Sequence, residues 1–461
     1  MTEPIVHPPG YRARRFQNWM LVGFLYSFFY MSRYSLAAIS PDLMHVFGWT
    51  KHEHLSIFET VLPWVYGLSV VVNGPIADRF GGRRAFLVGA AGVVVTSLLF
   101  GSFSFVVVAP AEWSAGDATI VQPARLLFGL NPTSLAWVMS AVWAVSGYFQ
   151  SFGALSIVKI NAQWFHLTER GTFAAIFGVL IRFGLILAFS GCPIILHFLP
   201  WQYAFWIPGA CVAVLFVLVL LFVAEKPEDA GFPSPDTGDP VAPGEGGTLQ
   251  VSAVLRRIFT NPVMWTIALG SMMIGIVRRS IIDTSWWPSY MREVHHVGKV
   301  DTVYQVTAAG MAVAGIIGGF VLGYMSDHVY GNRRAPVVVI GFTGMAGCLL
   351  LFLGVDAAAL GPWGAAASII AISFFINGAH GMIGGAASMD FGGKRGAATA
   401  AGLFDGMQYL AAAPIAGLLV PWVTKELGWQ AWKYLTIPWA IVGALVMRRI
   451  WNEVPRGRTG H

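Results

Sequence analysis

The chain has 461 residues, of which 56% are hydrophobic and 11% are charged, and its mean hydropathy is +0.64. Soluble domains carry about 25% charged residues, so this composition excludes both a soluble enzyme and a disordered chain. We assign the net charge of +6 to basic loops on one side of a membrane rather than to nucleic-acid binding. The three cysteines lie in apolar runs and give no metal-ligand spacing, so no metal and no cofactor are expected.

Hydrophobic runs long enough to cross a bilayer, which takes about 20 apolar residues, occur twelve times. Six lie near residues 17–39, 56–77, 86–109, 134–158, 172–195 and 203–223, and six near 260–284, 303–325, 336–355, 363–387, 397–421 and 431–450. Residues 224–258 are rich in Pro, Gly and Asp, which is typical of a linker. We therefore predict an all-α membrane protein with twelve transmembrane helices in two pseudosymmetric six-helix bundles. The bundles are residues 1–223 and 259–461, joined by a cytoplasmic linker at 224–258.

The distribution of basic residues predicts the orientation of these spans. If both termini are cytoplasmic, eighteen of the 29 Lys and Arg residues lie in cytoplasmic segments and six in outer segments, Lys433 among the six. This bias agrees with the positive-inside rule. The other five basic residues fall inside predicted spans; they are Arg33, Lys159, Arg182, Arg278 and Arg279.

Two loops at corresponding places in the two halves repeat each other. GPIADRFGGRR at 74–84 follows the second span, and GYMSDHVYGNRR at 323–334 follows the eighth, 249 residues later. Such repeats are typical of secondary transporters. The aspartate of each loop can cap a helix end or pair with a loop arginine. We expect a structural or gating role, and no substrate contact, for Gly74, Asp78, Arg79, Arg83, Gly323, Asp327 and Arg333.

Arg33 and Arg278 occupy corresponding places in the two halves, 245 residues apart. They lie eight and ten residues before a proline at the outer end of their spans, which at about 1.5 Å per residue puts them within one helical turn of the same depth. An arginine there costs at least about 2.5–3.5 kcal/mol, so it needs a water-filled cavity or a counter-charge. Each guanidinium can bind a phosphate or carboxylate with two hydrogen bonds. We therefore favour a substrate-binding pair over two structural ion pairs.

Arg279 is expected to be paired within its own helix. Adjacent helical residues point about 100° apart, so only one of Arg278 and Arg279 faces the centre of a cavity. Asp283 lies four residues after Arg279, the spacing of a helical ion pair. An Arg279–Asp283 pair would leave Arg278 for the ligand.

Other ionisable residues in the spans have two interpretations each. Lys159 lies near the cytoplasmic end of its span, where it either reaches the headgroups or binds substrate. Arg182 lies in mid-span and needs a partner, which is either Asp405 or the substrate. Glu59, His380 and Asp405 are candidate proton carriers for coupling, although a lone histidine is more often simply hydrogen-bonded.

Aromatic and amide side chains line the same helices. Tyr26, Tyr30 and Tyr34 recur every four residues and form a stripe that Arg33 borders. A stripe of this kind usually packs helices together, so we select only Tyr30 and Tyr34 from it as substrate contacts. The other lining candidates are Tyr66, Gln150, Asn377 and Gln408.

Several segments resemble known transporter families. The two repeated loops resemble the signature loops of the major facilitator superfamily. More narrowly, the chain resembles organophosphate:phosphate antiporters in FYMSR at 29–33, WF at 164–165, ERG at 169–171, RRSIID at 278–283, WPSYM at 287–291, GYMSD at 323–327 and KRGAATAAG at 394–402. The resemblance implies that Arg33 and Arg278 bind the substrate phosphate. Two positions depart from the family pattern: Val70 replaces a usual lysine and Ile181 a frequent histidine.

These features predict a carrier and not an enzyme. The sequence has no Walker-type phosphate loop, HExxH motif or Ser/His/Asp set, so a solute or ion gradient supplies the energy. We expect a monomer in a bacterial inner membrane that exchanges a small organophosphate for inorganic phosphate by rocker-switch alternating access. Its expected partners are the anionic substrate and lipid. The alternatives are a proton-coupled symporter of an organic acid or phosphonate, and a non-transporting sugar-phosphate sensor.

Overall fold

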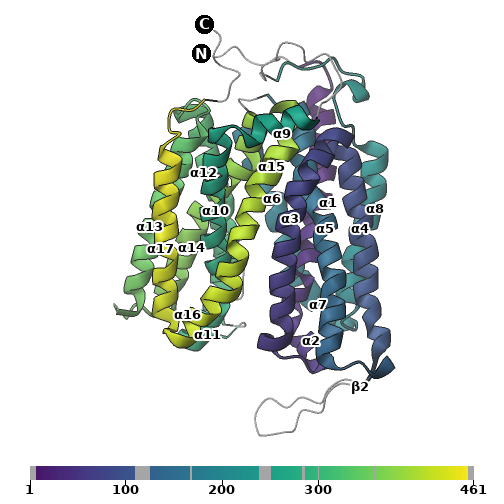
Figure 1. Cartoon of the computed structure of the whole chain (residues 1–461), viewed down its shortest axis with the longest axis vertical. Helices are drawn as coiled ribbons and strands as arrows, with labels where there is room; N and C mark the ends of the chain where they lie inside the picture. Colours follow the sequence, from purple (N-terminus) through teal and green to yellow (C-terminus); the bar gives the residue numbers. More distant parts are fainter. Residues whose placement is uncertain are drawn as a thin grey trace. The chain divides into compact units, whose positions relative to one another are not determined.

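The structure is a computed structural model that describes residues 7–109, 125–166, 169–237, 251–282, 286–298, 301–357 and 359–454. These residues are almost entirely helical (Figure 1). The chain forms two compact units. Unit 1 comprises Met1–Ser69, Phe80–Trp164 and Leu180–Pro235, and unit 2 comprises Val70–Arg79, Phe165–Val179 and Asp236–His461. The limits of the linker, 224 and 258, stay a prediction.

Four long helices form the body of unit 1 and pack side by side (Figure 1). They are α1 (Tyr11–Ala38), α4 (Gly82–Ser102), α5 (Pro132–Trp164) and α8 (Tyr203–Phe222). Close approach depends on small residues: a Cβ at Gly89 would lie 2.8 Å from the Phe149 carbonyl oxygen. The other elements are α2 (Ser40–Phe47), η1 (Lys51–Leu55), η2 (Phe103–Val106), the antiparallel pair β1 (Val107–Ala109) and β2 (Arg125–Leu126), η3 (Leu127–Gly129), η5 (Leu187–Gly191), α7 (Cys192–Phe198) and η6 (Glu228–Ala230). Two helices, α3 (Ser56–Phe80) and α6 (Arg170–Ile186), contribute to both units.

Unit 2 is built on six long helices, in which α10 packs on α15 and α17, and α14 packs on α12 and α13. They are α10 (Pro262–Ile281), α12 (Thr302–Tyr324), α13 (Arg334–Ala357), α14 (Gly361–His380), α15 (Ser388–Pro414) and α17 (Gly428–Arg448). The shorter elements are α9 (Val251–Phe259), α11 (Trp286–His295), η7 (Met325–Val329), η8 (Gly381–Ala387), η9 (Ile415–Leu419) and α16 (Val420–Glu426).

The predicted hydrophobic runs lie mainly on helical segments, although the run 86–109 ends in β1 and residues 283 and 284 of the run 260–284 lie outside the described residues. Nine stretches of the described residues are long and apolar enough to cross a membrane, and one of them, Gly361–Glu426, has 66 residues. A straight helix of that length would measure about 100 Å, far more than a bilayer. The backbone breaks at Gly393, where φ is 63° and ψ is −178°, a conformation that glycine adopts readily. This break separates the tenth predicted run from the eleventh.

Two helices of unit 1 extend past their apolar runs, because polar side chains hold their ends. The first predicted run begins at residue 17, but α1 begins at Tyr11, whose hydroxyl donates to the Trp164 carbonyl over 2.9 Å. About two turns later, the amide of Asn18 exchanges hydrogen bonds of 2.9 and 2.8 Å with the backbone of Ala224. The same Tyr11 contact explains why α5 continues to Trp164, beyond the run that ends at 158.

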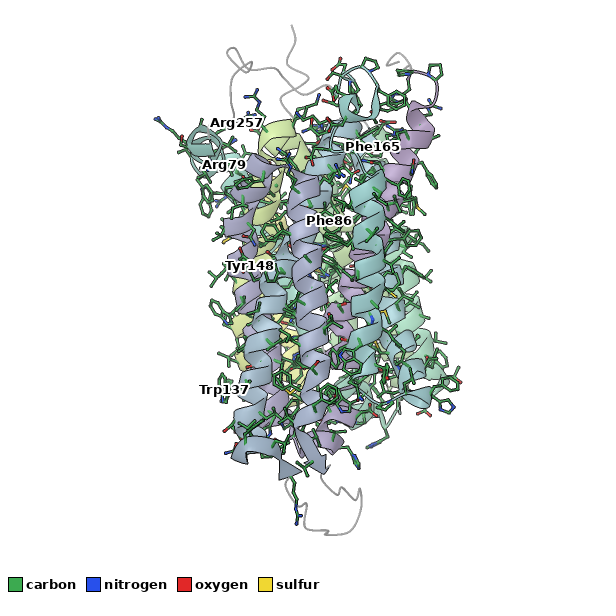
Figure 2. The ribbon with its side chains drawn as sticks, turned by 90° about the vertical axis from the view of Figure 1, so that its right-hand side faces the viewer. Arg79, Phe86, Trp137, Tyr148, Phe165 and Arg257 are labelled. Atoms are coloured by element: carbon green, nitrogen blue, oxygen red, sulfur yellow. The ribbon has the colours of Figure 1, made fainter. Side chains whose placement is uncertain are left out.

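Large apolar side chains cover the outside of the helices as well as the inside. Phe86 of α4 is fully buried, whereas Trp137 and Tyr148, on the outer face of α5, are 57% and 37% exposed (Figure 2). In unit 2, Leu351 is 73% exposed. Lipid tails solvate such side chains and water does not, so this exterior is typical of a membrane-embedded protein.

Candidate functional site

Arg33 is held in unit 1 by side chains from three helices. It is 6% exposed, and its Nε donates to Oε1 of Gln150 on α5 over 2.7 Å. The guanidinium carbon lies 4.4 Å from the ring centroid of Tyr66 on α3 and 5.0 Å from that of Tyr30 on α1. Both distances suit cation–π attraction. Gln150 is fixed in turn, because its Nε2 donates to the Ser146 hydroxyl over 3.0 Å.

The two tyrosines selected from the stripe on α1 have different relations to Arg33. Tyr30 contacts the guanidinium directly, as described above. Tyr34, one turn later, stacks on Tyr30 with a centroid separation of 5.8 Å and also contacts Phe189 at 5.9 Å. Tyr26 packs where Gly153 of α5 leaves room, since a Cβ there would lie 2.6 Å from its ring. The stripe therefore combines helix packing at Tyr26 with an arginine contact at Tyr30.

Arg278 is held in unit 2 by a polar cluster. It is 5% exposed, and its Nη1 lies 3.1 Å from both Gln408 Oε1 on α15 and His380 Nε2 on α14. Gln408 Nε2 donates to the hydroxyl of Ser271 on α10 over 3.1 Å and lies 3.1 Å from His380 Nδ1. Three helices thus fix the position of Arg278, as three helices fix Arg33.

Arg278 and Arg279 have different environments, as their helical positions require. Arg279 is half-buried, and its guanidinium carbon lies 5.8 Å from the ring centroid of Tyr409. The proposed partner of Arg279, Asp283, lies outside the described residues, so the Arg279–Asp283 ion pair stays a prediction.

The remaining candidates differ in burial. Lys159 on α5 is 6% exposed and Arg182 on α6 is 9% exposed. Lys159 lies five residues before the end of α5 and beside the start of α4. A Cβ added at Gly82, the first residue of α4, would lie 3.0 Å from the Cβ of Lys159. Asp405 on α15 is half-buried, and Glu59 on α3 is exposed.

The aspartates of the two repeated loops differ: one caps a helix, and the other pairs with a loop arginine. Asp78 caps: its carboxylate accepts from the backbone N–H groups of Ala398 and Thr399, at 3.3 and 2.7 Å, and from the Thr399 hydroxyl at 2.6 Å. These groups lie in the first two turns of α15 after Gly393, where a negative charge is favourable. Asp327 instead pairs with a loop arginine, and that arginine is Arg334.

The other loop residues mainly contact backbone and neighbouring loop groups. Arg333 Nε donates to the Tyr330 carbonyl over 3.1 Å. The backbone N–H of Arg83 donates to the carboxylate of Glu225 over 2.6 Å, and its guanidinium donates to the Leu220 carbonyl. Gly74 lies against α15, since a Cβ there would sit 2.8 Å from the Ala398 carbonyl oxygen. Arg79 belongs to the same short segment of unit 2 as Gly74, and Gly323 is buried near the end of α12.

A buried ionic cluster beside the second loop was not found from the sequence. Arg334 donates from Nε to Oδ2 of Asp390 over 2.7 Å. Arg170 donates from Nη1 to Oδ1 of the same carboxylate over 3.5 Å and to the Met389 carbonyl over 3.1 Å. Arg170 and Arg334 are two of the eighteen basic residues that the charge count assigns to cytoplasmic segments. The distance in sequence, 220 residues between Arg170 and Asp390, leaves no local spacing from which the pair could be recognised.

Lys433 corrects one part of the charge count. The charge count assigns it to an outer segment, but it lies in the second turn of α17 with its side chain fully buried. Its Nζ donates to Asp356 Oδ2 over 2.7 Å and to the Tyr290 hydroxyl over 2.9 Å, and His295 Nε2 lies 2.9 Å from the same hydroxyl. The sequence already indicates that Lys433 lies in a helix and not in a loop, because it falls inside the predicted run 431–450.

The apolar exterior and the long apolar helices define a multi-pass membrane protein. Residues 22–416 match the Major Facilitator Superfamily, and the chain therefore belongs to this superfamily of transporters. Its fold has twelve transmembrane helices, which confirms the predicted number of spans, and the protein is a transporter rather than an enzyme. Within the part of the chain that the structure describes, no group of three or more His, Cys, Asp or Glu could hold a metal ion.

Individual relatives match over almost the whole chain. A protein described as a probable hexose phosphate transport protein of Chlamydia muridarum is 24% identical over 100% of this chain and 96% of its own length. The glycerol-3-phosphate transporter of Bacillus subtilis is 25% identical over 97% and 94% of the two chains. The membrane sensor protein UhpC of Escherichia coli is 25% identical over 92% and 90%. These relatives agree with the resemblance to organophosphate:phosphate antiporters.

A solved structure supports the fold independently. The proton:xylose symporter XylE, bound to 6-bromo-6-deoxy-D-glucose, superimposes with a TM-score of 0.69 at 13% sequence identity. The match covers 96% of this chain and 97% of that one. Because the identity is this low, the likeness is one of fold.

Proposed function

We propose that this protein exchanges a small phosphate ester for inorganic phosphate across a bacterial inner membrane, and that Arg33 and Arg278 bind the phosphate group. The observation that carries the proposal is the setting of these two arginines. Each is buried at a corresponding place in one repeat, and each is oriented by an amide, from Gln150 in one case and Gln408 in the other. The amides that hold them orient each guanidinium, and a guanidinium can bind an oxyanion with two hydrogen bonds. An oxyanion is the complementary ligand.

The relatives support the class of substrate. Two of the proteins that match over more than nine tenths of this chain are named for hexose phosphate and glycerol 3-phosphate. The changed positions Val70 and Ile181 alter the set of cations relative to the family pattern, so the organic part of the substrate is left open. Arg182 and Lys159, both buried, are the further cations that we propose as substrate contacts, with Tyr30 and Tyr34 beside Arg33.

The transport cycle that we propose is electrostatic. In an empty site, two or more guanidinium groups repel one another and oppose closure. A bound dianion neutralises their charge and favours the occluded state. A ligand shifts a conformational equilibrium only by the difference in its affinity for the two states. Phosphate and phosphate esters would both provide that difference, so exchange follows without a separate energy source.

Counterflow in proteoliposomes tests this function. The protein is reconstituted with labelled phosphate outside and an unlabelled phosphate ester, phosphonate or sugar acid inside. We expect phosphate esters to drive uptake of label and sugar acids to fail. Uptake that requires a pH gradient and proceeds without internal phosphate would instead identify a proton-coupled symporter, with Glu59, Asp405 or His380 as the proton carrier.

Replacing either arginine by lysine tests the site. We expect Arg33→Lys and Arg278→Lys each to reduce exchange to near background, because a point charge cannot make the two-pronged hydrogen bonds of a guanidinium. Arg292→Lys is the matched control, since the side chain of Arg292 on α11 is 68% exposed. Near-normal exchange by either buried variant would contradict the proposal.

A sensor is the second candidate function, because one relative that covers 92% of this chain is named a membrane sensor protein. A sensor would bind a sugar phosphate without moving it. Tight binding by the purified protein, together with no counterflow for any ligand of the panel, would identify this function.

A further inference from the structure

The short helix α9 lies at one end of unit 2, just before the chain enters α10. It runs across the ends of the long helices of this unit instead of along them (Figure 1). It packs on α15 and α10. Ile258 is 3% exposed, and a Cβ at Gly396 of α15 would lie 3.1 Å from Val254 Cγ1 and 3.2 Å from Ile258 Cδ1. One face of α9 is therefore fixed against α15.

A stripe of apolar side chains continues from α9 along the first turns of α10. The Trp265 indole donates to the Phe259 carbonyl over 2.8 Å, and the two rings lie 6.0 Å apart. Trp265 is 38% exposed, and Leu269, one turn later on the same side of α10, is 37% exposed. A tryptophan near the end of a membrane span is typical of the boundary between lipid headgroups and tails. This boundary puts α9 at the level of the headgroups.

The two arginines of α9 lie on different sides of the helix, and both side chains are exposed. At about 100° per residue, Arg256 is about 60° around the helix from Phe259, whereas Arg257 is about 160° from it. Arg256 is therefore next to the apolar stripe, and Arg257 is on the far side of α9 from the stripe.

The charge around α9 is positive. No acidic residue occurs in the sequence between Glu245 and Asp283, a stretch that contains all of α9 and α10. Lys394 and Arg395 directly precede Gly396, the residue of α15 against which α9 packs. Such an arrangement of charges attracts anions.

From this arrangement we infer that unit 2 has a binding site for an anionic phospholipid. Arg256 binds the phosphate of the headgroup, and an acyl chain lies along Trp265 and Leu269. A guanidinium makes two hydrogen bonds to a phosphate. A lipid with a net negative charge, such as phosphatidylglycerol, fits better than phosphatidylcholine, because its headgroup brings no cation into a positive environment. The site goes beyond the proposed function, since it depends neither on the transported substrate nor on the orientation of the protein.

Lipid binding by the full-length protein in a non-ionic detergent tests the inference. Native mass spectrometry measures how much phosphatidylglycerol or phosphatidylcholine the protein retains, and the melting temperature measures the stabilisation that each lipid provides. We expect the wild type to prefer phosphatidylglycerol. Arg256→Gln should weaken phosphatidylglycerol binding about fivefold, the effect of one basic residue at a lipid surface, and should change phosphatidylcholine binding little. Arg256→Lys should recover part of the affinity, because it keeps the charge.

Arg257→Gln is the matched control, since it removes the same charge from the other side of the same helix. We expect it to bind phosphatidylglycerol almost as the wild type does. An equal loss in Arg256→Gln and Arg257→Gln would indicate a diffuse positive field without a site, and would overturn the inference. Equal binding of the two lipids by the wild type would also overturn it, and would leave this face of α9 to an acidic protein partner.

Two further measurements distinguish a phospholipid from a free phosphate ion. An excess of inorganic phosphate should not displace phosphatidylglycerol, and displacement would show that the site binds a free phosphate ion instead. Leu269→Gln puts an amide beside the proposed acyl chain, so it should weaken phosphatidylglycerol binding. Leu445→Gln on α17 is its control, because Leu445 is 59% exposed and lies away from the stripe. Wild-type binding by Leu269→Gln would contradict the proposed path of the acyl chain.

Discussion

At the scale of single residues, buried charges in this protein are positioned by neutral hydrogen-bond partners as well as by opposite charges. Arg33 and Arg278 are oriented by glutamines. Lys433, in contrast, is paired with Asp356 and also donates to Tyr290. A carboxylate neutralises the cation that it orients, whereas an amide orients a cation without neutralising it. An amide partner is therefore compatible with the anion binding that we propose for Arg33 and Arg278.

The pair of Lys433 and Asp356 yields a stability prediction. Asp356→Ala leaves a fully buried ammonium without its carboxylate, so we expect it to lower the free energy of unfolding by about 1–3 kcal/mol. The double variant Lys433→Met with Asp356→Leu should be close to the wild type, because it removes both charges together. Thermal unfolding in detergent measures both, with Lys425→Met, at an 83% exposed side chain, as the control. Equal losses in the single and double variants would argue against the pairing.

At the scale of helices, small residues decide where segments can approach. A Cβ at Gly402 of α15 would lie 2.4 Å from the Val70 carbonyl oxygen, and one at Gly74 would lie 2.9 Å from the Thr399 Cα. Both obstacles are backbone atoms, which cannot rotate away. The contact between segment 70–79 and α15 is also the place where Asp78 accepts its three hydrogen bonds. Close packing and helix capping thus depend on the same two glycines.

Alanine at these glycines tests that dependence. We expect Gly402→Ala and Gly74→Ala each to cost about 1–3 kcal/mol of stability, since overpacking forces the backbones apart. Gly347→Ala on α13 is the matched control, because no heavy atom of the described residues outside its own helix lies within 4 Å of its ideal Cβ. That variant should be neutral or more stable, as alanine favours a helix. Melting temperatures that do not distinguish the three variants would contradict the packing argument.

At the scale of the whole molecule, the orientation of the spans in the membrane is the property that charge counting predicts. Eighteen of the 29 basic residues lie in segments that the prediction makes cytoplasmic. Arg257, on α9, belongs to one of these segments, and Glu293, on α11, lies near a segment predicted to face outward. Both side chains are exposed, so each is a suitable position for a label.

Cysteine labelling in intact cells checks this orientation. After Cys192, Cys211 and Cys348 are replaced by serine or alanine, we expect a membrane-impermeant maleimide to label Glu293→Cys and to leave Arg257→Cys unlabelled until the cells are opened. The positive-inside bias is the physical reason. Labelling in the opposite order would reverse the predicted topology, whereas the twelve-helix fold would stand.

The spans could be predicted because the requirement of a bilayer is local: a long apolar run must form a helix that satisfies its own backbone. The intramembrane arginines could be predicted for the same reason, since an isolated charge in such a run stands out. The start of α1 at Tyr11 could not, because its anchor is the carbonyl of Trp164, 153 residues away. The substrate roles of Arg33, Arg278 and the other candidates stay predictions.

The sequence by itself therefore determined that this protein crosses a membrane twelve times and which charged residues lie within its apolar runs, since hydropathy and spacing are properties of a continuous stretch of chain. Only the tertiary structure decided the partners of those charges. Gln150 meets Arg33 across 117 residues, Gln408 and His380 meet Arg278 across 130 and 102, and Asp78 reaches Thr399 across 321. Such contacts depend on which helix faces pack together, and many residue pairs in the sequence would have satisfied the same chemistry.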